Sequence, residues 1–152
     1  MAASPARTEL ALVNLWLVDT GPLVAYLDAA DPHHARVCSA MDDFSGRPIT
    51  TPAVITEAMY FASGSVGGAA ALADLVDRSG MTVYDLCQPA DLREAARLME
   101  RYGDTPMDFA DATLVLLAEV LEVLDVLTLD RRGFSTYRTP GGGGFRLVLD
   151  RE

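Results

Sequence analysis

Lysine is missing from this 152-residue chain, and all twelve of its basic residues are arginines. The absence excludes every mechanism that needs a lysine amine, including Schiff-base chemistry and the Walker A nucleotide-binding loop. It also argues against a receiver-type phosphoacceptor domain. Arginine is well suited to bidentate phosphate contacts, but biased codon usage in the source genome explains the missing lysine at least as well.

Cysteine and histidine are also scarce, with two of each, at Cys38, Cys87, His33 and His34. The spacing matches neither a disulfide framework nor a zinc motif. We therefore expect two buried free thiols in a reducing compartment. Adjacent histidines do not share a helix face, so we expect them to be exposed helix residues and not metal ligands.

The chain is strongly acidic, with a formal net charge of −10. A general nucleic-acid binder would be basic, so this charge indicates a basic partner, bound cations or a locally basic rim. The apolar run Leu10 to Val18 is interrupted by Asn14 and ended by Asp19, unlike a signal-peptide core. The apolar stretch Ala112 to Leu129 contains three acidic residues, unlike a transmembrane helix. We expect a cytoplasmic protein without membrane contact.

Strand-like and helix-like segments alternate along the chain. The pair Thr51-Pro52, for example, has the cap-then-proline pattern of a helix start. The alternation predicts an α/β three-layer domain, with a mostly parallel central sheet flanked by helices. The length suits one domain over residues 11–152, after a flexible tail at residues 1–10. The expected strands are 12–18, 48–50, 81–84, 123–129 and 145–149, and the expected helices begin at residues 20, 31, 51, 69, 89 and 105.

Four acidic residues occupy positions that ordinary folding does not favour. Asp19 and Asp130 each end a strand-like apolar run, and Glu57 and Asp111 lie inside amphipathic helical segments. Sites in open parallel sheets form beyond the carboxyl ends of the strands. Buried acids are costly unless neutralised, and a hard divalent cation with oxygen ligands neutralises several at once. If the four converge, they predict a magnesium- or manganese-dependent enzyme acting on phosphate esters.

Each acid also has a simpler interpretation. Asp19 is a good N-cap for the helix that follows it, Asp130 suits a turn, and Glu57 suits a solvated helix face. Asp108 and Asp111 lie one helical turn apart and would complement a helix dipole. These interpretations are credible one at a time and less credible together, in this order around strand ends.

Four segments resemble the four motifs of PIN domains. They are LVDTGPLVA at 17–25, ITTPAVITEA at 49–58, PMDFADA at 106–112 and LTLDRRGF at 127–134. The order and spacing of the motifs match as well, and the resemblance covers nearly the whole chain from about residue 12. The compact length and the ending Tyr137 to Val148 resemble VapC-type toxins of bacterial toxin–antitoxin pairs.

The resemblance implies a metal-dependent endoribonuclease that uses Mg²⁺ or Mn²⁺ to activate a water for phosphodiester hydrolysis. It implies a small antitoxin protein as partner, and we expect a homodimer formed through exposed apolar helix faces. A housekeeping RNA-processing nuclease of the same fold, or an inactive PIN interaction module, remains an alternative. The implied catalytic and metal-binding acids are Asp19, Glu57, Asp111 and Asp130, with Asp108 as a further metal ligand and Thr20 and Thr128 as hydroxyl groups beside the site.

Arginines are the candidates for holding RNA on so acidic a protein. Arg131, Arg132 and Arg138 follow Asp130 closely, and three more recur at every fourth position from Arg93 to Arg101, on one helix face. A salt-bridged surface is the simpler interpretation of both groups. In the functional interpretation they flank the acidic pocket and bind phosphates.

Overall fold

A five-stranded sheet in the order β3-β2-β1-β4-β5 forms the centre of the protein. The computed structural model describes residues 13–65 and 67–151, so the tail expected at residues 1–10 lies outside the described residues. Every pairing between neighbouring strands is parallel, which confirms the expected α/β class. The strands are β1 (Leu15–Val18), β2 (Arg47–Thr50), β3 (Thr82–Val83), β4 (Asp125–Leu127) and β5 (Arg146–Leu147).

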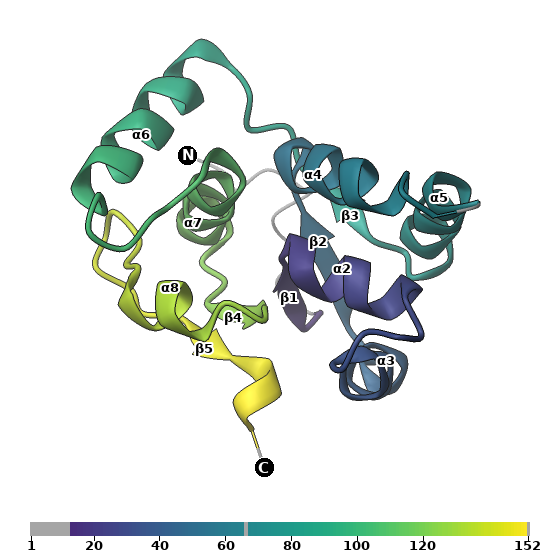
Figure 1. Ribbon diagram of the computed structural model, residues 1–152. Coiled ribbons are helices and arrows are strands. Elements are labelled where there is room, and N and C mark those ends of the chain that lie inside the picture. Colours follow the sequence, from purple (N-terminus) through teal and green to yellow (C-terminus); the bar gives the residue numbers. More distant parts are fainter. Residues whose placement is uncertain (1–12, 66, 152) are drawn as a thin grey trace.

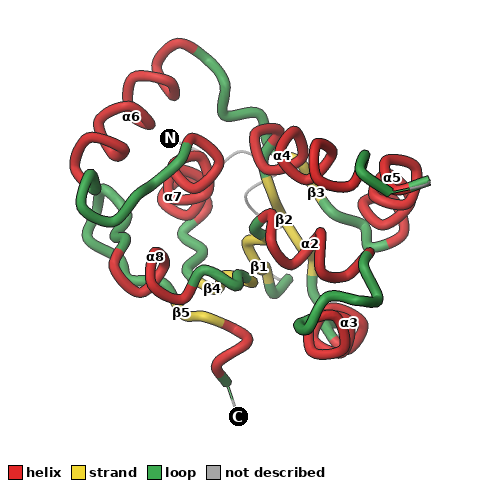
Figure 2. Tube along the Cα trace, viewed as in Figure 1, coloured by secondary structure: helices red, strands yellow, loops and turns green. Residues whose placement is uncertain are grey.

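Helices connect the strands and enclose the sheet. In Figure 1, α2 to α5 gather on one side of the view, around β1 to β3, and α6 to α8 gather on the other. Figure 2 shows how loops alternate with these helices along the chain. The helices are α2 (Thr20–Leu27), α3 (His34–Asp43), α4 (Pro52–Ala62), α5 (Gly68–Arg78), α6 (Pro89–Arg101), α7 (Phe109–Leu121), α8 (Arg131–Thr136) and the short 3-10 helix η1 (Val148–Asp150).

The order of the strands explains where a site can form. The chain proceeds from β1 outward to β2 and β3, then returns to place β4 on the other side of β1. Strand order therefore reverses between β1 and β4, where the carboxyl ends of parallel strands leave a crevice. The register pairs Leu17 with Val126 and Val18 with Leu127, so Asp19 and Thr128 emerge next to each other.

The core lies on both faces of the sheet. Leu17, Ile49 and Val126 are fully buried strand residues, and α7 is buried along most of its length, from Ala110 to Ala118 with the exception of Asp111. This near-continuous apolar pattern is typical of a helix enclosed by the rest of the protein. The N-terminus of α7, which carries the acids of the third motif, is therefore held by the core.

Several predicted boundaries were wrong. The helix expected from Thr105 begins at Phe109, because Asp108 caps it and keeps an extended backbone. The helix α8 was not predicted, and Asp130, which also suited a turn, caps it. The strand expected at 145–149 is β5 with only two residues, followed by η1.

The cysteines and histidines also differ from expectation in their burial. Cys38 is half-buried and Cys87 is exposed, so the two thiols are not both in the core. His33 is exposed, but His34 is half-buried, and its Nδ1 lies 2.8 Å from the carbonyl oxygen of Ala25. Within the described ranges, no helix combines the length and the apolarity that crossing a membrane would need.

Candidate active site

Asp19 lies at the junction of β1 and α2 and is only 7% exposed. Its backbone N–H donates to the carbonyl of Leu127, which extends the β1–β4 ladder by one bond. Its Oδ1 accepts from the Thr20 amide at 2.8 Å, so the N-cap reading was right, and its Oδ2 accepts from the Thr128 hydroxyl at 2.7 Å. Burial raises the pKa of Asp19 to about 6, and the Asp108 and Asp130 carboxylates add to the shift.

Thr128 connects Asp19 to Asp130. Its Oγ1 donates to Asp19 and accepts from the backbone N–H of Asp130 at 2.9 Å. The Asp130 carboxylate then accepts from the Gly133 amide at 2.9 Å and so caps α8. One hydroxyl therefore orders the acid of the first motif, Asp19, and that of the fourth motif, Asp130, at the neighbouring ends of β1 and β4.

Asp108 and Asp111 form a reciprocal capping box at the start of α7. Asp108 Oδ1 accepts from the Asp111 amide at 2.8 Å, and Asp111 Oδ2 accepts from the Asp108 amide at 3.2 Å. Burial, together with the charges of Asp19, Asp108 and Asp130, raises the pKa of Asp111 to about 8. Four acids from distant parts of the sequence therefore lie close enough to repel one another.

Glu57 approaches the same acids from α4. It is half-buried, and burial and the Asp108 carboxylate raise its pKa, while the Thr20 hydroxyl opposes the shift. A buried hydrogen bond of 2.7 Å between the hydroxyls of Thr51 and Thr113 joins the start of α4 to α7. Thr113 was not predicted from the sequence, although it is the single polar residue in the apolar run 112–118.

The side chains suit a hard divalent cation in kind. Every group at the site offers oxygen, and the hydroxyl of Thr20 is buried without a hydrogen-bond partner among the described residues. In the described part of the chain, however, no three histidine, cysteine, aspartate or glutamate side chains are arranged to hold an ion. Instead, Asp19, Asp111 and Asp130 each direct one carboxylate oxygen to a backbone amide.

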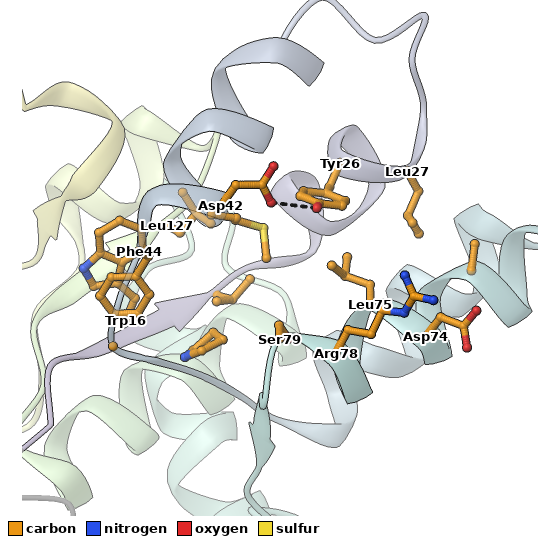
Figure 3. Close-up of a pocket in the computed structure, with 15 residues that line it drawn as sticks. Trp16, Tyr26, Leu27, Asp42, Phe44, Asp74, Leu75, Arg78, Ser79 and Leu127 are labelled. Carbon is orange, nitrogen blue, oxygen red and sulfur yellow. Dashed lines mark hydrogen bonds between the residues drawn. The ribbon is translucent and has the colours of Figure 1, made fainter.

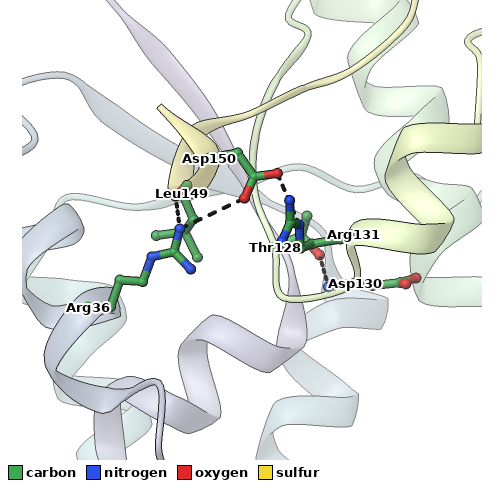
Figure 4. Close-up of polar contacts among 6 residues, drawn as sticks. All are labelled: Arg36, Thr128, Asp130, Arg131, Leu149 and Asp150. Atoms are coloured by element: carbon green, nitrogen blue, oxygen red, sulfur yellow. Dashed lines mark hydrogen bonds and ion pairs between the residues drawn. The ribbon is translucent and has the colours of Figure 1, made fainter. Parts of the chain in front are cut away.

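The arginines that follow Asp130 differ in what they contact. The Nε of Arg131 lies 3.2 Å from Oδ2 of Asp150 in η1, and Arg36 from α3 approaches the other oxygen of Asp150 at 3.8 Å. Arg36 also donates to the carbonyl of Leu149. Figure 4 shows Asp150 between the two guanidinium groups, on the outer side of the Thr128–Asp130 turn. Arg131 remains 73% exposed and accessible to a ligand.

Arg138 has a structural role. Its Nη1 donates to the carbonyls of Ser135, Thr136 and Tyr137, at 2.8 to 3.2 Å, and so covers the C-terminal end of α8. Arg132 is exposed on the first turn of α8. On the predicted arginine face of α6, Arg97 pairs with Glu94. Arg131 and Arg132 are therefore better placed than Arg138 to receive a phosphate.

A cavity of about 520 Å³ lies apart from the carboxylates, between one face of the sheet and the helices α2, α3 and α5. Trp16 stacks on Phe44 at 3.8 Å in its wall, and Tyr26 donates to Asp42 at 2.8 Å. Figure 3 shows Asp74 and Arg78 from α5 beside this cavity, whose lining is as polar as it is apolar.

Residues 16–139 match the family model named PIN domain, and the chain belongs to the PIN domain family. It is similar to ribonuclease VapC26 of Mycobacterium tuberculosis, with 38% identity over 134 residues. That match covers 87% of this chain and 98% of VapC26.

The fold is also similar to the crystal structure of VapC20 of Mycobacterium tuberculosis, a toxin that cleaves the sarcin–ricin loop. The TM-score is 0.70 at 17% identity, covering 79% of this chain and 92% of the VapC20 chain. At this identity the likeness supports the fold, and the sequence similarity to VapC26 carries the family relationship.

Proposed function

We propose that this protein is a metal-dependent endoribonuclease and the toxin of a type II toxin–antitoxin pair. The observation that carries the proposal is the approach of Asp19, Asp108, Asp111 and Asp130 at a site where burial, and then the neighbouring carboxylates, raise the pKa of Asp19 and Asp111. The extensive similarity to ribonuclease VapC26 supports a toxin over a housekeeping nuclease. The retention of all four motif acids argues against an inactive interaction module.

Asp19, Glu57, Asp111 and Asp130 would hold Mg²⁺ or Mn²⁺, with Asp108 at the edge of the set. When bound, the ion supplies a water of lowered pKa and stabilises negative charge on the phosphate oxygens. The Thr128 hydroxyl holds Asp19 and the backbone of Asp130 in place. Arg131 and Arg132, beside Asp130, bind flanking phosphates of the RNA.

The partner in this proposal is a small antitoxin with a basic segment. The net charge of −10 and the crowded carboxylates favour a peptide arginine that reaches the site and replaces the cation's charge. The apolar wall of the cavity near Trp16 accommodates hydrophobic side chains of the same peptide. Two carboxylates, Asp42 and Asp74, face one guanidinium, Arg78, at the cavity, and this balance favours a basic peptide over an acidic one.

The proposal is tested by brief induction of the wild type and of Asp19→Asn, followed by mapping of new cellular RNA ends. We expect new ends at a restricted set of sites with the wild type and none with the variant. Co-expression with the product of the neighbouring gene should suppress cleavage and give a complex that co-purifies. Cleavage of many RNAs during normal growth without an inhibiting neighbour would favour the housekeeping alternative.

A further inference from the structure

Apart from Glu57 on α4, the acidic site consists of two halves that reach it by different routes. Asp19 and Asp130 follow the strands β1 and β4, whereas Asp108 and Asp111 begin α7. The segment 102–108, which precedes them, contains neither a helix nor a strand and appears as a loop in Figure 2. Because the carboxylates repel one another, this loop needs an attachment to the strand side.

Tyr137 provides that attachment. Its hydroxyl donates to the carbonyl of Pro106 at 2.8 Å, two residues before Asp108. The side chain is fully buried, and its ring packs edge-on against Tyr102 and Phe134, with centroids 5.2 and 5.3 Å away. Burial, and the negative charge of the acids, raise the pKa of Tyr137, so the hydroxyl keeps its proton and remains a donor.

The other end of the connection is Asp130. The helix α8 begins with the Asp130 cap on the Gly133 amide, and it ends where the Tyr137 amide donates to the Gly133 carbonyl at 2.9 Å. The Asp130 carboxylate and the Tyr137 hydroxyl both approach Gly133. A β-carbon there would lie 2.1 Å from Asp130 Oδ2 and 2.9 Å from the Tyr137 hydroxyl, so only glycine allows both to approach.

We propose that Tyr137 is a positioning residue that sets the separation between the two halves of the acidic site, with Gly133 as the contact point. The connection runs from Asp130 through Gly133 and the Tyr137 hydroxyl to Pro106 and Asp108. Through the short helix α8, the connection joins Asp130, which follows β4, to the start of α7. Tyr137 touches neither substrate nor cation and acts by placing the carboxylates. This inference rests on the proposed function, because it concerns the cation that these acids would bind.

The test compares Mn²⁺ binding by the full chain, measured by calorimetry, in the wild type, Tyr137→Phe and Tyr26→Phe. The Phe variant removes one oxygen from Tyr137 and keeps its ring, and the freed carbonyl of exposed Pro106 can bond to water. The control removes a hydroxyl that bonds to Asp42, at the cavity. We expect the Mn²⁺ affinity of Tyr137→Phe to fall about tenfold and that of Tyr26→Phe to stay unchanged.

RNA cleavage provides a second measurement. Because Tyr137 acts through the ligands, cleavage by Tyr137→Phe should recover toward the wild-type rate as Mn²⁺ is raised to saturation. A Mn²⁺ affinity within about twofold of the wild type would overturn the inference, even if the variant melts at a lower temperature. If Tyr137→Phe does not fold, Gly133→Ala decides by the same criterion, because its methyl group displaces Asp130 or Tyr137. A wild type that binds no Mn²⁺ would instead refute the proposed function, and this inference with it.

Discussion

The hydroxyl of Thr128 donates a 2.7 Å hydrogen bond to the carboxylate of Asp19, across 109 residues of sequence. The same oxygen accepts from the Asp130 amide, so a single threonine orders two acids at the strand ends. A carboxylate buried to this extent is costly in its charged form unless partners or a cation stabilise it. The predictions below follow from this balance.

Removing a ligand acid should abolish cleavage while preserving the fold. Asp19→Asn and Asp111→Asn should each lower the rate of RNA cleavage by more than about a hundredfold, because a lost ligand costs at least as much as a lost supporting contact. Asp108→Asn should have a smaller effect, since Asp108 is exposed. Gel-based cleavage of labelled RNA checks this, with circular dichroism as the control for folding. Full activity of Asp111→Asn would remove it from the site.

Mn²⁺ should stabilise the folded protein. At a metal concentration of about 100 times Kd, linkage contributes about 2.7 kcal/mol to the free energy of unfolding. For a chain of this size that corresponds to a rise in Tm of about 5 to 10 °C. Thermal melting in EDTA and in Mn²⁺ measures the shift. Asp19→Asn should lose most of this rise in Tm. An equal rise in the wild type and in Asp19→Asn would place the ion elsewhere.

Without metal, stability should fall as pH rises. The folded-state pKa values of Asp19 and Asp111, about 6 and about 8, lie above that of an unfolded aspartate, about 4. The folded state therefore keeps protons that the unfolded state releases, so the contribution is present below about pH 4 and lost as pH rises through about 6 and 8. Urea unfolding in EDTA at about pH 5 and about pH 8.5 should show this loss. Asp111→Asn should show a flatter dependence, and an identical slope would contradict the assignment.

Arg131 and Arg132, which follow Asp130, should contribute to RNA binding. Changing Arg131 and Arg132 to Gln should weaken binding and reduce the slope of log K against log salt by about 1.4, at about 0.7 per single-strand phosphate contact. Asp150→Asn should strengthen binding, because it frees Arg131 from its ion pair. Affinity measured over a salt series, with Ca²⁺ in place of Mg²⁺, gives both results. An unchanged slope in the double Gln variant would leave the arginines of α6 as the remaining candidates.

Exposed aromatic residues on α4 should support self-association. Tyr60 and Phe61 are 79% and 56% exposed, and Leu92 and Met99 are exposed on α6. Burying such side chains against a second copy favours a dimer. Light scattering coupled to gel filtration should show a dimer for the wild type and a monomer for Tyr60→Ser with Phe61→Ser. Val120→Ser on α7 is a control that should remain dimeric, and dimers in all three would place the interface elsewhere.

The sequence alone was enough to predict the α/β class, the parallel sheet and the segments that carry the acids. Periodicity, cap-then-proline pairs and strand-end acids are local signals, and each reflects the preference of a short stretch of backbone. The start of α7 was predicted wrongly and the helix α8 was not predicted, because Asp108 and Asp130 serve as caps, and capping depends on the direction in which a side chain points. The same direction leaves the carboxylates facing backbone amides, which the pattern of acids did not reveal.

Only the tertiary structure decided how the acids are held. The bonds from Thr128 to Asp19, from Thr51 to Thr113 and from Tyr137 to Pro106 join residues between 31 and 109 positions apart. Such pairs leave no periodic mark in the sequence, because each hydroxyl would fit equally well at the surface or as a helix cap. The sequence determined which groups carry charge and near which strand ends they lie. The packing of α4, α7 and α8 around β1 and β4 decided their separation, because that packing brings distant segments to one edge of the sheet.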